Sequence, residues 1–403
     1  MEVKPAIETF AKIKVVGVGG SGSAAINRMI SARTRGVEFI AINTDAQALH
    51  QSRAPVKVHI GKETTRGLGA GMDPELGGQA ADESKDEIKD TVKNADMVFL
   101  TCGLGGGTGS GASPLVAELA QAAGALTVAV VTKPFSFEGA QRRSIAERGL
   151  EQLADKVDTI ITIPNDRILQ LIDKKTTLLE SFAFVDEVLR QGVQGISDII
   201  TIPGLINVDF ADVKAIMAGA GSALMGIGIA KGENKAVDAA KAAIDSPLLE
   251  MSIEGAKGIL FTITGGPDLS MYDVNEAARV ITASADPNAK IIFGAVIDEN
   301  LKDELFITVI ATGFSQLAKK NINHSATAPS YSPLSFFKSE RLADETGKKG
   351  AKGFKKDEAA KRERSAPAKA PVYEEQLKID QDETAKSLDE DYEIPAFIRK
   401  KLK

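Results

Sequence analysis

The stretch GLGGGTGSG, residues 103–111, has six glycines and lies between an apolar run, ADMVFLTC (95–102), and a helix-like pattern, ASPLVAELAQAAG (112–124). Backbone N–H groups without a neighbouring Cβ can surround an anion, and the positive end of a helix adds favourable potential. A glycine in an ordered helix costs up to ~1 kcal/mol relative to alanine, so a close-packing turn explains the run less well than a ligand does. The stretch therefore predicts an anion-binding turn between a strand and a helix.

A second glycine loop, GVGGSG at 17–22, matches the G-x-G-x-x-G pattern, and Asp45 ends the next apolar run. Alone, this pattern is typical of an NAD-dependent oxidoreductase, with Asp45 on a ribose, or of a structural turn. Two glycine turns on neighbouring strands can instead enclose a triphosphate, with Thr108 and Ser110 as hydroxyl donors. The lysine of a P-loop is missing from both loops, so we expect a metal ion such as Mg²⁺ to neutralise the phosphates.

Continuous Val, Ile and Leu runs alternate with helical patterns in the first part of the chain, which favours a doubly wound, Rossmann-like parallel sheet of the α/β class. We expect its strands at residues 12–19, 37–44, 96–102, 125–132 and 158–164.

Residues 176–201 carry apolar side chains at helical spacing and predict a long central helix between two domains. Beyond it, a smaller α/β domain is expected, with strands at 222–230, 255–266, 289–298 and 304–313 and helices at 234–246 and 270–285.

Composition restricts the class of protein. A chain of 403 residues suggests two domains plus extensions, and the net charge of −6 argues against nucleic-acid binding. The single cysteine, Cys102, fits a reducing compartment and reads as a small buried residue. With no apolar run of membrane-spanning length, we expect a cytoplasmic protein without direct membrane insertion.

The composition changes near the C-terminus. Residues 320–388 are dense in Lys, Glu, Asp, Ser, Pro and Ala, which predicts a disordered tether. The end, DYEIPAFIRKKLK (391–403), combines apolar and basic side chains and is interpreted as a docking peptide, or as a frayed terminus with an incidental apolar patch.

The segment GLINVDFADVKAIM (204–217) contains three polar candidates, Asn207, Asp209 and Asp212. In one interpretation, Asp209 is a helix N-cap and Asp212 favours the first helical turn. In the other, the carboxylates hold a cation and polarise a water for attack on a phosphate. The two roles are compatible for Asp212, which can project outward from a first turn.

Together these motifs resemble FtsZ, the tubulin-like GTPase of prokaryotic cell division, over residues 12 to about 316. The tail peptide is similar to that family's partner-binding peptide and indicates a bacterial member. The resemblance is carried by the two glycine loops and by NTDAQAL (43–49), GLGAG (67–71), TKPFSFEG (132–139), IPNDRIL (163–169) and NVDFADV (207–213).

The resemblance implies a tubulin/FtsZ-like fold organised as a flexible N-terminus (1–11), a GTP-binding domain (12–175), a central helix (176–203), a C-terminal domain (204–316), a disordered linker (317–389) and a partner-binding peptide (390–403). It also implies which residues face the phosphates of GTP: Gly19, Gly20, Ser21, Gly22, Ser23, Ala24, Gly103, Gly105, Gly106, Gly107, Thr108, Gly109 and Ser110. Ser21 and Ala24 depart from the family pattern, which has more glycine and an asparagine there.

For the rest of the nucleotide, the resemblance implies a γ-phosphate loop at Ala70 and Gly71, and guanine recognition by Asn165 and Asp186. Glu138 would take the ribose hydroxyls or be a surface acid, and Phe182 would stack on the base or be core. Arg142 is preferred to Arg143 on alignment alone. The remaining pocket residues are Asn43, Asp45, Thr132 and Pro134.

The family mechanism implies that Asp209, Asp212 and Asn207 complete the site of a neighbouring subunit, so that GTP is hydrolysed within head-to-tail filaments. Such a protein would form a ring at the division site and bind membrane-tethering adaptors and regulators through residues 390–403. A nucleotide-binding scaffold without turnover remains a further alternative.

Overall fold

The computed structural model describes residues 11–172, 175–202, 204, 206, 208–249, 251–299, 301 and 303–314. The predictions for most of the N-terminal extension (1–11), for Asn207, for the linker (317–389) and for the tail peptide (390–403) therefore lie outside the described residues. No helix in the described part of the chain is long and apolar enough to cross a membrane.

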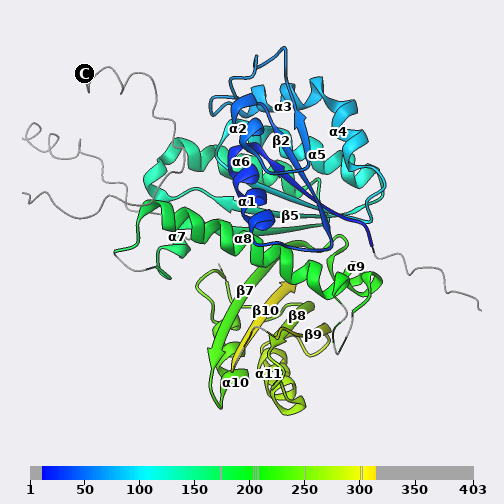
Figure 1. The fold of residues 1–403 in the computed structure, drawn as a ribbon, viewed down its shortest axis with the longest axis vertical. Coiled ribbons are helices and arrows are strands. Elements are labelled where there is room, and N and C mark those ends of the chain that lie inside the picture. The colour runs from blue at the N-terminus through cyan, green and yellow to red at the C-terminus, as the bar shows by residue number, and fades with distance from the viewer. Residues whose placement is uncertain are drawn as a thin grey trace, which may run out of the picture. The chain divides into compact units, whose positions relative to one another are not determined.

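One ten-stranded sheet forms the framework, in the order β3-β2-β1-β4-β5-β6-β7-β10-β8-β9 (Figure 1). Its first six strands are parallel, as predicted. Their bounds are β1 (Ile13–Val18), β2 (Val37–Asn43), β3 (Val56–His59), β4 (Met97–Gly103), β5 (Leu126–Lys133) and β6 (Thr159–Pro164). The short edge strand β3 was not among the predicted strands.

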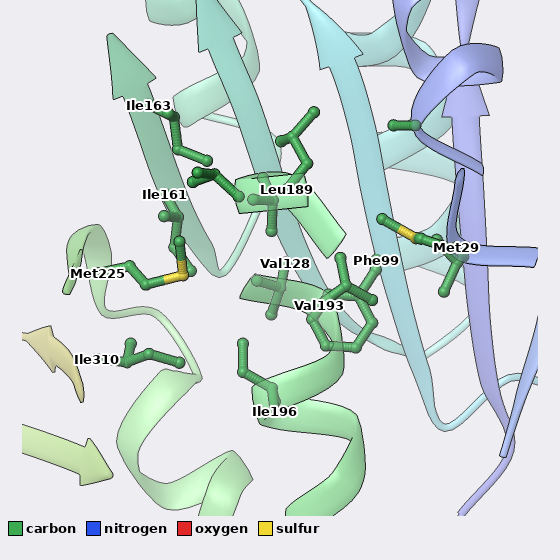
Figure 2. Close-up of a cluster of buried hydrophobic side chains, with 14 of the residues drawn as sticks. Met29, Phe99, Val128, Ile161, Ile163, Leu189, Val193, Ile196, Met225 and Ile310 are labelled. Carbon is green, nitrogen blue, oxygen red and sulfur yellow. The ribbon is translucent and has the colours of Figure 1, made fainter. Parts of the chain in front are cut away.

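Helices cover both faces of this parallel half, which confirms the doubly wound class. One face carries α1 (Gly19–Ser31) and α8 (Leu178–Thr201), whose apolar side chains form a buried cluster with alternate residues of the strands. Figure 2 shows Leu189, Val193 and Ile196 of α8 over Phe99 and Val128. The other face is covered by α3 (Pro74–Glu83), α4 (Lys85–Val92), α5 (Gly107–Ala122) and α6 (Ala140–Ala154).

The predicted long helix is α8, with 24 residues, which corresponds to about 36 Å at 1.5 Å per residue. Thr177 caps its start by accepting from the N–H of Glu180. Near this start, Phe182 meets Phe135, which follows β5 at the carboxyl edge of the sheet. At the other end, Thr201 lies against Gly36, which precedes β2 at the amino edge. The helix α8 therefore spans the sheet from its carboxyl edge to its amino edge.

The second half continues the same sheet. β7 pairs in parallel with β6 through Thr159–Ile161 and Gly221–Ala223, and β10 is antiparallel to both of its neighbours. The helices α10 and α11 cover one face and form a separate apolar cluster with it. The bounds are α9 (Phe210–Met217), β7 (Gly221–Lys231), α10 (Lys235–Ile244), β8 (Gly258–Gly265), α11 (Met271–Ala283), β9 (Lys290–Ile297) and β10 (Glu304–Thr312).

The shorter helices of the first half connect strands at the carboxyl edge. They are α2 (Ala46–Gln51), the 3₁₀ turn η1 (Ser136–Glu138) and α7 (Asn165–Ile168). Because β1 and β4 are adjacent and in register, the two glycine loops that follow them leave the same edge side by side. This is the position at which ligands bind in open parallel sheets.

Candidate functional site

The first glycine loop forms the opening turn of α1, which begins at Gly19. Gly19 has φ of +74°, and a Cβ at this position would lie 3.1 Å from the nitrogen of Gly109 in the second loop. Gly20, Ser21 and Ala24 are exposed, whereas Ser23 is buried and donates its hydroxyl to the carbonyl of Gly19 at 2.8 Å. The exposed residues are therefore the ones open to a ligand.

The second loop uses most of its glycines for close packing. A Cβ on five of its six glycines would approach a neighbouring atom closer than 3.0 Å, whereas a Cβ on Gly106 would meet nothing within 4 Å. The neighbours include Ser21 for Gly103, the carbonyl of Arg142 for Gly105 and that of Ala70 for Gly107. Packing thus accounts for more of the glycine run than the sequence suggested, and Gly106 is the position whose small size packing leaves unexplained.

The hydroxyls of the second loop are engaged within the protein. Ser110 is fully buried and accepts a hydrogen bond from the N–H of Gly105 at 2.9 Å. The hydroxyl oxygens of Thr108 and Thr44 lie 2.6 Å apart, and both side chains are buried. Thr132, at the end of β5, lies beside Gly103.

The loop 61–73 reaches the start of α5. Ala70 is buried against Gly107, and Gly71 is exposed with open space around its α-carbon. Glu83 of α3 holds the base of this loop, because its carboxylate accepts from the N–H groups of Glu63 and Thr64, each at 3.0 Å. These bonds, with one from the Thr64 hydroxyl, lower the pKa of Glu83 below its usual range.

Two buried amides near the carboxyl edge have unpaired atoms. Nδ2 of Asn43 and Oδ1 of Asn165 have no hydrogen-bond partner, although these side chains are only 2% and 6% exposed. The oxygen of the Asn43 amide, Oδ1, accepts from the N–H of Asp45, whose own carboxylate caps α2 through Ala48. A buried amide left unpaired costs free energy, so a ligand that pairs with it is favoured.

Phe182 is half exposed and makes an edge contact with Phe135, with ring centroids 5.7 Å apart. It is thus not plain core. Asp186 lies one turn further along α8. Burial raises its pKa to about 6, although the positive charge of the Arg28 guanidinium lowers the pKa in part. A carboxylate whose pKa is raised by burial would gain from a ligand that presents N–H groups.

The carboxylate of Glu138 is held by two hydrogen bonds. One carboxylate oxygen accepts from the N–H of Phe135 at 2.9 Å, and the other accepts from Arg142 at 2.8 Å. Arg143, the alternative arginine, instead pairs with Asp166 at 3.7 Å. Pro134 and the backbone carbonyl of Arg142 lie beside Gly105, and the choice between the guanidinium groups of Arg142 and Arg143 stays a prediction.

Asp209 and Asp212 lie at the opposite edge. Asp209 is the N-cap of α9 and Asp212 is in its first turn, as the first interpretation predicted, and both are exposed. Residues following α9 bind Asp158 at the start of β6, where the N–H of Gly221 donates to its carbonyl at 2.9 Å. Ile206 is held to the edge strand β9, because its carbonyl accepts from Ala295 at 3.2 Å. In Figure 1, α9 lies at one end of α8 and α7 at the other.

Groups near the carboxyl edge suit a polar ligand that both donates and accepts hydrogen bonds. The unpaired amide atoms are a donor on Asn43 and an acceptor on Asn165, and three glycines from three loops (Gly20, Gly71 and Gly106) have free space around them. Within the described ranges there is no cluster of three or more His, Cys, Asp or Glu side chains arranged to hold a metal ion.

Family models match two parts of the chain: the Tubulin/FtsZ family GTPase domain at residues 12–173 and the FtsZ family C-terminal domain at 221–315. The solved structure titled FtsZ dimer, empty, from M. jannaschii is 47% identical, with a TM-score of 0.74, over 76% of this chain and 89% of that one. The chain belongs to the FtsZ family.

A second M. jannaschii FtsZ structure, that of a point mutant, matches equally well at 47% identity and a TM-score of 0.74, over 76% of this chain and 92% of that chain. CetZ2 from Haloferax volcanii shares the fold at 22% identity and a TM-score of 0.65, over 77% of this chain and 96% of that chain. FtsZ family membership confirms the predicted family and fold, and it identifies a GTPase domain whose nucleotides are GTP and GDP. The bacterial origin stays a prediction.

Two residues of this FtsZ family member were missed by sequence reasoning. Thr44 lies inside the quoted NTDAQAL motif but carries no separate signal, since a threonine at a strand end is common. Arg28, which acts on Asp186, lies 158 positions earlier on α1. Only the packing of α1 against α8 brings the two together.

Proposed function

We propose that this chain binds GTP across its two glycine loops and hydrolyses it when a second copy supplies Asp209 and Asp212. Asn207 of the same loop is included in this proposal from the resemblance. The predicted domain boundaries at 175, 203 and 316 belong to the same proposal.

The position of the acids is the observation that carries this function. The glycine loops follow β1 and β4 at the carboxyl edge, whereas Asp209 begins the helix whose far end binds the start of β6. The long helix α8, about 36 Å long, runs between these two edges. Because one molecule cannot bring its own acids to its own phosphates, a second copy has to provide them.

This arrangement supports a head-to-tail contact, in which the acid end of one subunit meets the nucleotide end of the next. A heterologous contact of this kind extends into an open filament. The family relative whose title describes an FtsZ dimer is consistent with self-association. We further propose that the filaments form a ring at the division site in the cytoplasm and bind adaptors and regulators through residues 390–403.

Each nucleotide group has a partner in this proposal. The amide of Asn165 and the carboxylate of Asp186 would bind the base, with Phe182 against its ring, and Asn43 would border the same pocket. Glu138 would accept from the ribose, and Arg142 would hold Glu138 in place. The N–H groups that open α1 and α5 would bind the phosphates, with Ala70 and Gly71 at the γ-phosphate. Mg²⁺ held by the phosphates would neutralise part of their charge.

The remaining pocket residues support the second glycine loop and Asn43. Thr132 and Pro134 flank Gly103 and Gly105, and Ser110 holds the loop through Gly105. Asp45 keeps Asn43 in place through its backbone N–H. Hydrolysis requires a water activated by Asp209 or Asp212 and aimed at the γ-phosphate.

The decisive experiment mixes two inactive variants. Asp212→Ala keeps the pocket and lacks the acid, and Gly106→Arg blocks the pocket and keeps both acids. Mixed in equal amounts, they should recover roughly a quarter of wild-type phosphate release, because random head-to-tail pairing joins a good pocket to a good acid loop in that fraction of contacts. Gly106→Arg mixed with the double variant Gly106→Arg/Asp212→Ala should show no phosphate release, because neither protein has an open pocket.

Two parallel measurements complete the test. Wild-type phosphate release should rise more than linearly with protein concentration, and light scattering should rise with GTP but not with GDP. Linear turnover in dilute protein would show a site complete within one molecule. Deletion of residues 390–403 should leave turnover and scattering intact, and loss of GTP binding upon that deletion would contradict the role of the tail.

A further inference from the structure

We propose that Thr44 is a positioning residue that donates its hydroxyl proton to Thr108 and thereby frees the proton of Thr108 for a phosphate oxygen. This inference rests on the proposed GTP site and concerns a residue to which the proposed function gives no role.

Thr44 lies where three loops of the site meet. Its hydroxyl oxygen is 2.6 Å from that of Thr108, which opens α5. Its carbonyl lies 3.4 Å from the hydroxyl of Thr65, in the loop that continues to Ala70, and the single proton of that hydroxyl goes to the closer carbonyl of Gly61 at 2.9 Å. Thr108 in turn lies against Gly19 of the first glycine loop. Thr44 therefore joins the end of β2 to the second glycine loop and lies beside the loop of Thr65, and its side chain does not reach the surface, since it is 0% exposed.

The direction of the hydroxyl bond follows from burial. A hydroxyl has one proton and accepts through two lone pairs. Thr44 is fully buried, and the only partner of its hydroxyl among the described side chains is Thr108. If Thr44 accepted, its own proton would be unpaired in the interior, which is unfavourable. If it donates, both protons are used, because Thr108 retains one for an anion at the helix start.

The consequence is a coupled pair of hydroxyls. Removal of the Thr44 hydroxyl leaves the oxygen of Thr108 without a donor and lets its proton turn away from the phosphate. Thr44→Ser keeps the donor, whereas Thr44→Val keeps the shape and loses the donor. A role in packing alone would tolerate valine at least as well as serine, so the order of these two variants separates the two roles.

The test is a double-mutant cycle on the full chain, with dissociation constants for GTP and GDP measured on dilute, unassembled protein. Thr44→Val should weaken binding of GTP about tenfold, and Thr44→Ser should stay within about twofold. Thr108→Val should weaken binding by at least as much, and the double variant no more than Thr108→Val alone. Thr34→Val is the matched control, since it removes a buried hydroxyl with no partner at the opposite edge.

The outcomes decide separately on this inference and on the proposed function. Additive losses in the cycle, or a serine variant as weak as the valine variant, would overturn the role of Thr44. If Thr44→Val unfolds at a low temperature, Thr44→Ala serves as a second variant without the donor. Unfolding of both variants would show that Thr44 is structural, which would also overturn its positioning role. Failure of the wild-type chain to bind guanine nucleotides would instead reject the proposed function.

Discussion

The carboxylate of Asp209 accepts a hydrogen bond from the backbone N–H of Asp212 at 2.8 Å. The two acids of the proposed catalytic loop therefore have different surroundings. One oxygen of Asp209 is used to cap α9, and the carboxylate of Asp212 projects from the first turn.

Substitution should separate capping from catalysis at these acids. Asp209→Asn keeps a good N-cap and loses the charge, whereas Asp209→Ala loses both and should cost about 1 kcal/mol of unfolding free energy. Asp212→Asn should abolish most phosphate release with little change in stability. Thermal unfolding and phosphate release on the same samples check this, and full turnover by Asp212→Asn would remove Asp212 from the mechanism.

The glycines of residues 103–111 should fall into two classes. Gly111→Ala puts a Cβ into the carbonyl of Pro74 of α3 and should destabilise the fold by about 1–3 kcal/mol. Gly106→Ala meets open space and should keep the wild-type melting temperature while it weakens nucleotide binding. If Gly106→Ala bound GTP as the wild type does, this glycine would have no ligand-related role.

Guanine binding should depend on pH through Asp186. Burial raises its pKa to about 6, so the carboxylate is ionised at pH 7.5 and becomes protonated below about pH 6. A protonated carboxyl loses its capacity to accept two N–H groups, and affinity for GDP should fall over this range. Asp186→Asn should bind GDP weakly at pH 7.5, and its affinity should change less with pH. Dividing the affinity of the wild type by that of the variant at each pH cancels the effect of the titration of the phosphates. An unchanged ratio between pH 7.5 and 5.5 would count against base recognition by Asp186.

Stability should depend on pH through Asp198, a partly buried acid of α8 outside the site. Burial raises its pKa to about 6, although Gln194 and Arg190 act against this. Because the folded state binds this proton more tightly than the unfolded state, the contribution of Asp198 to stability is full below about pH 4 and is lost as pH rises through about 6. Asp198→Asn should therefore be more stable than wild type at pH 7.5, by of order 1–3 kcal/mol, with the difference shrinking toward pH 5. Urea unfolding at both pH values measures it, and Glu151→Gln on the exposed face of α6 is the control.

The loop that leads to Ala70 should depend on Glu83. Glu83→Gln removes one of the two acceptors for the N–H groups of Glu63 and Thr64 and should lower the affinity for GTP more than that for GDP, because only GTP has the γ-phosphate that this loop is proposed to contact. Asp82→Asn makes the same change of charge on the neighbouring exposed residue and should leave the ratio unchanged. Equal effects of the two variants would point to surface charge instead.

The parts of this structure that follow from local pattern could be predicted from sequence. The apolar runs predicted nine of the ten strands, and the 3.6-residue periodicity predicted α8. β3 was missed because four residues, VKVH, are too short for a periodic signal. The N-cap role of Asp209 was predicted, since capping depends on neighbours in sequence.

Contacts between distant segments could not be read from sequence in the same way. The glycines of 103–111 were read as an anion cradle, but the carbonyls against which they pack belong to residues such as Ala70, Pro74 and Arg142. The bond between Thr44 and Thr108 depends on β2 and β4 lying on either side of β1. Such relations follow from strand order, which no single stretch encodes.

The bond between Ile206 and Ala295 has a consequence for building chimeras. It attaches the segment that carries the acids to the edge strand of the C-terminal half, while the residues after α9 bind Asp158 in the half that holds the glycine loops. A graft that starts after Thr201 would therefore transplant the acids together with β9, and the bonds to Asp158 would be made with the recipient chain. Chimeric chains joined at that residue would exchange the proposed acid end while the glycine loops stay native.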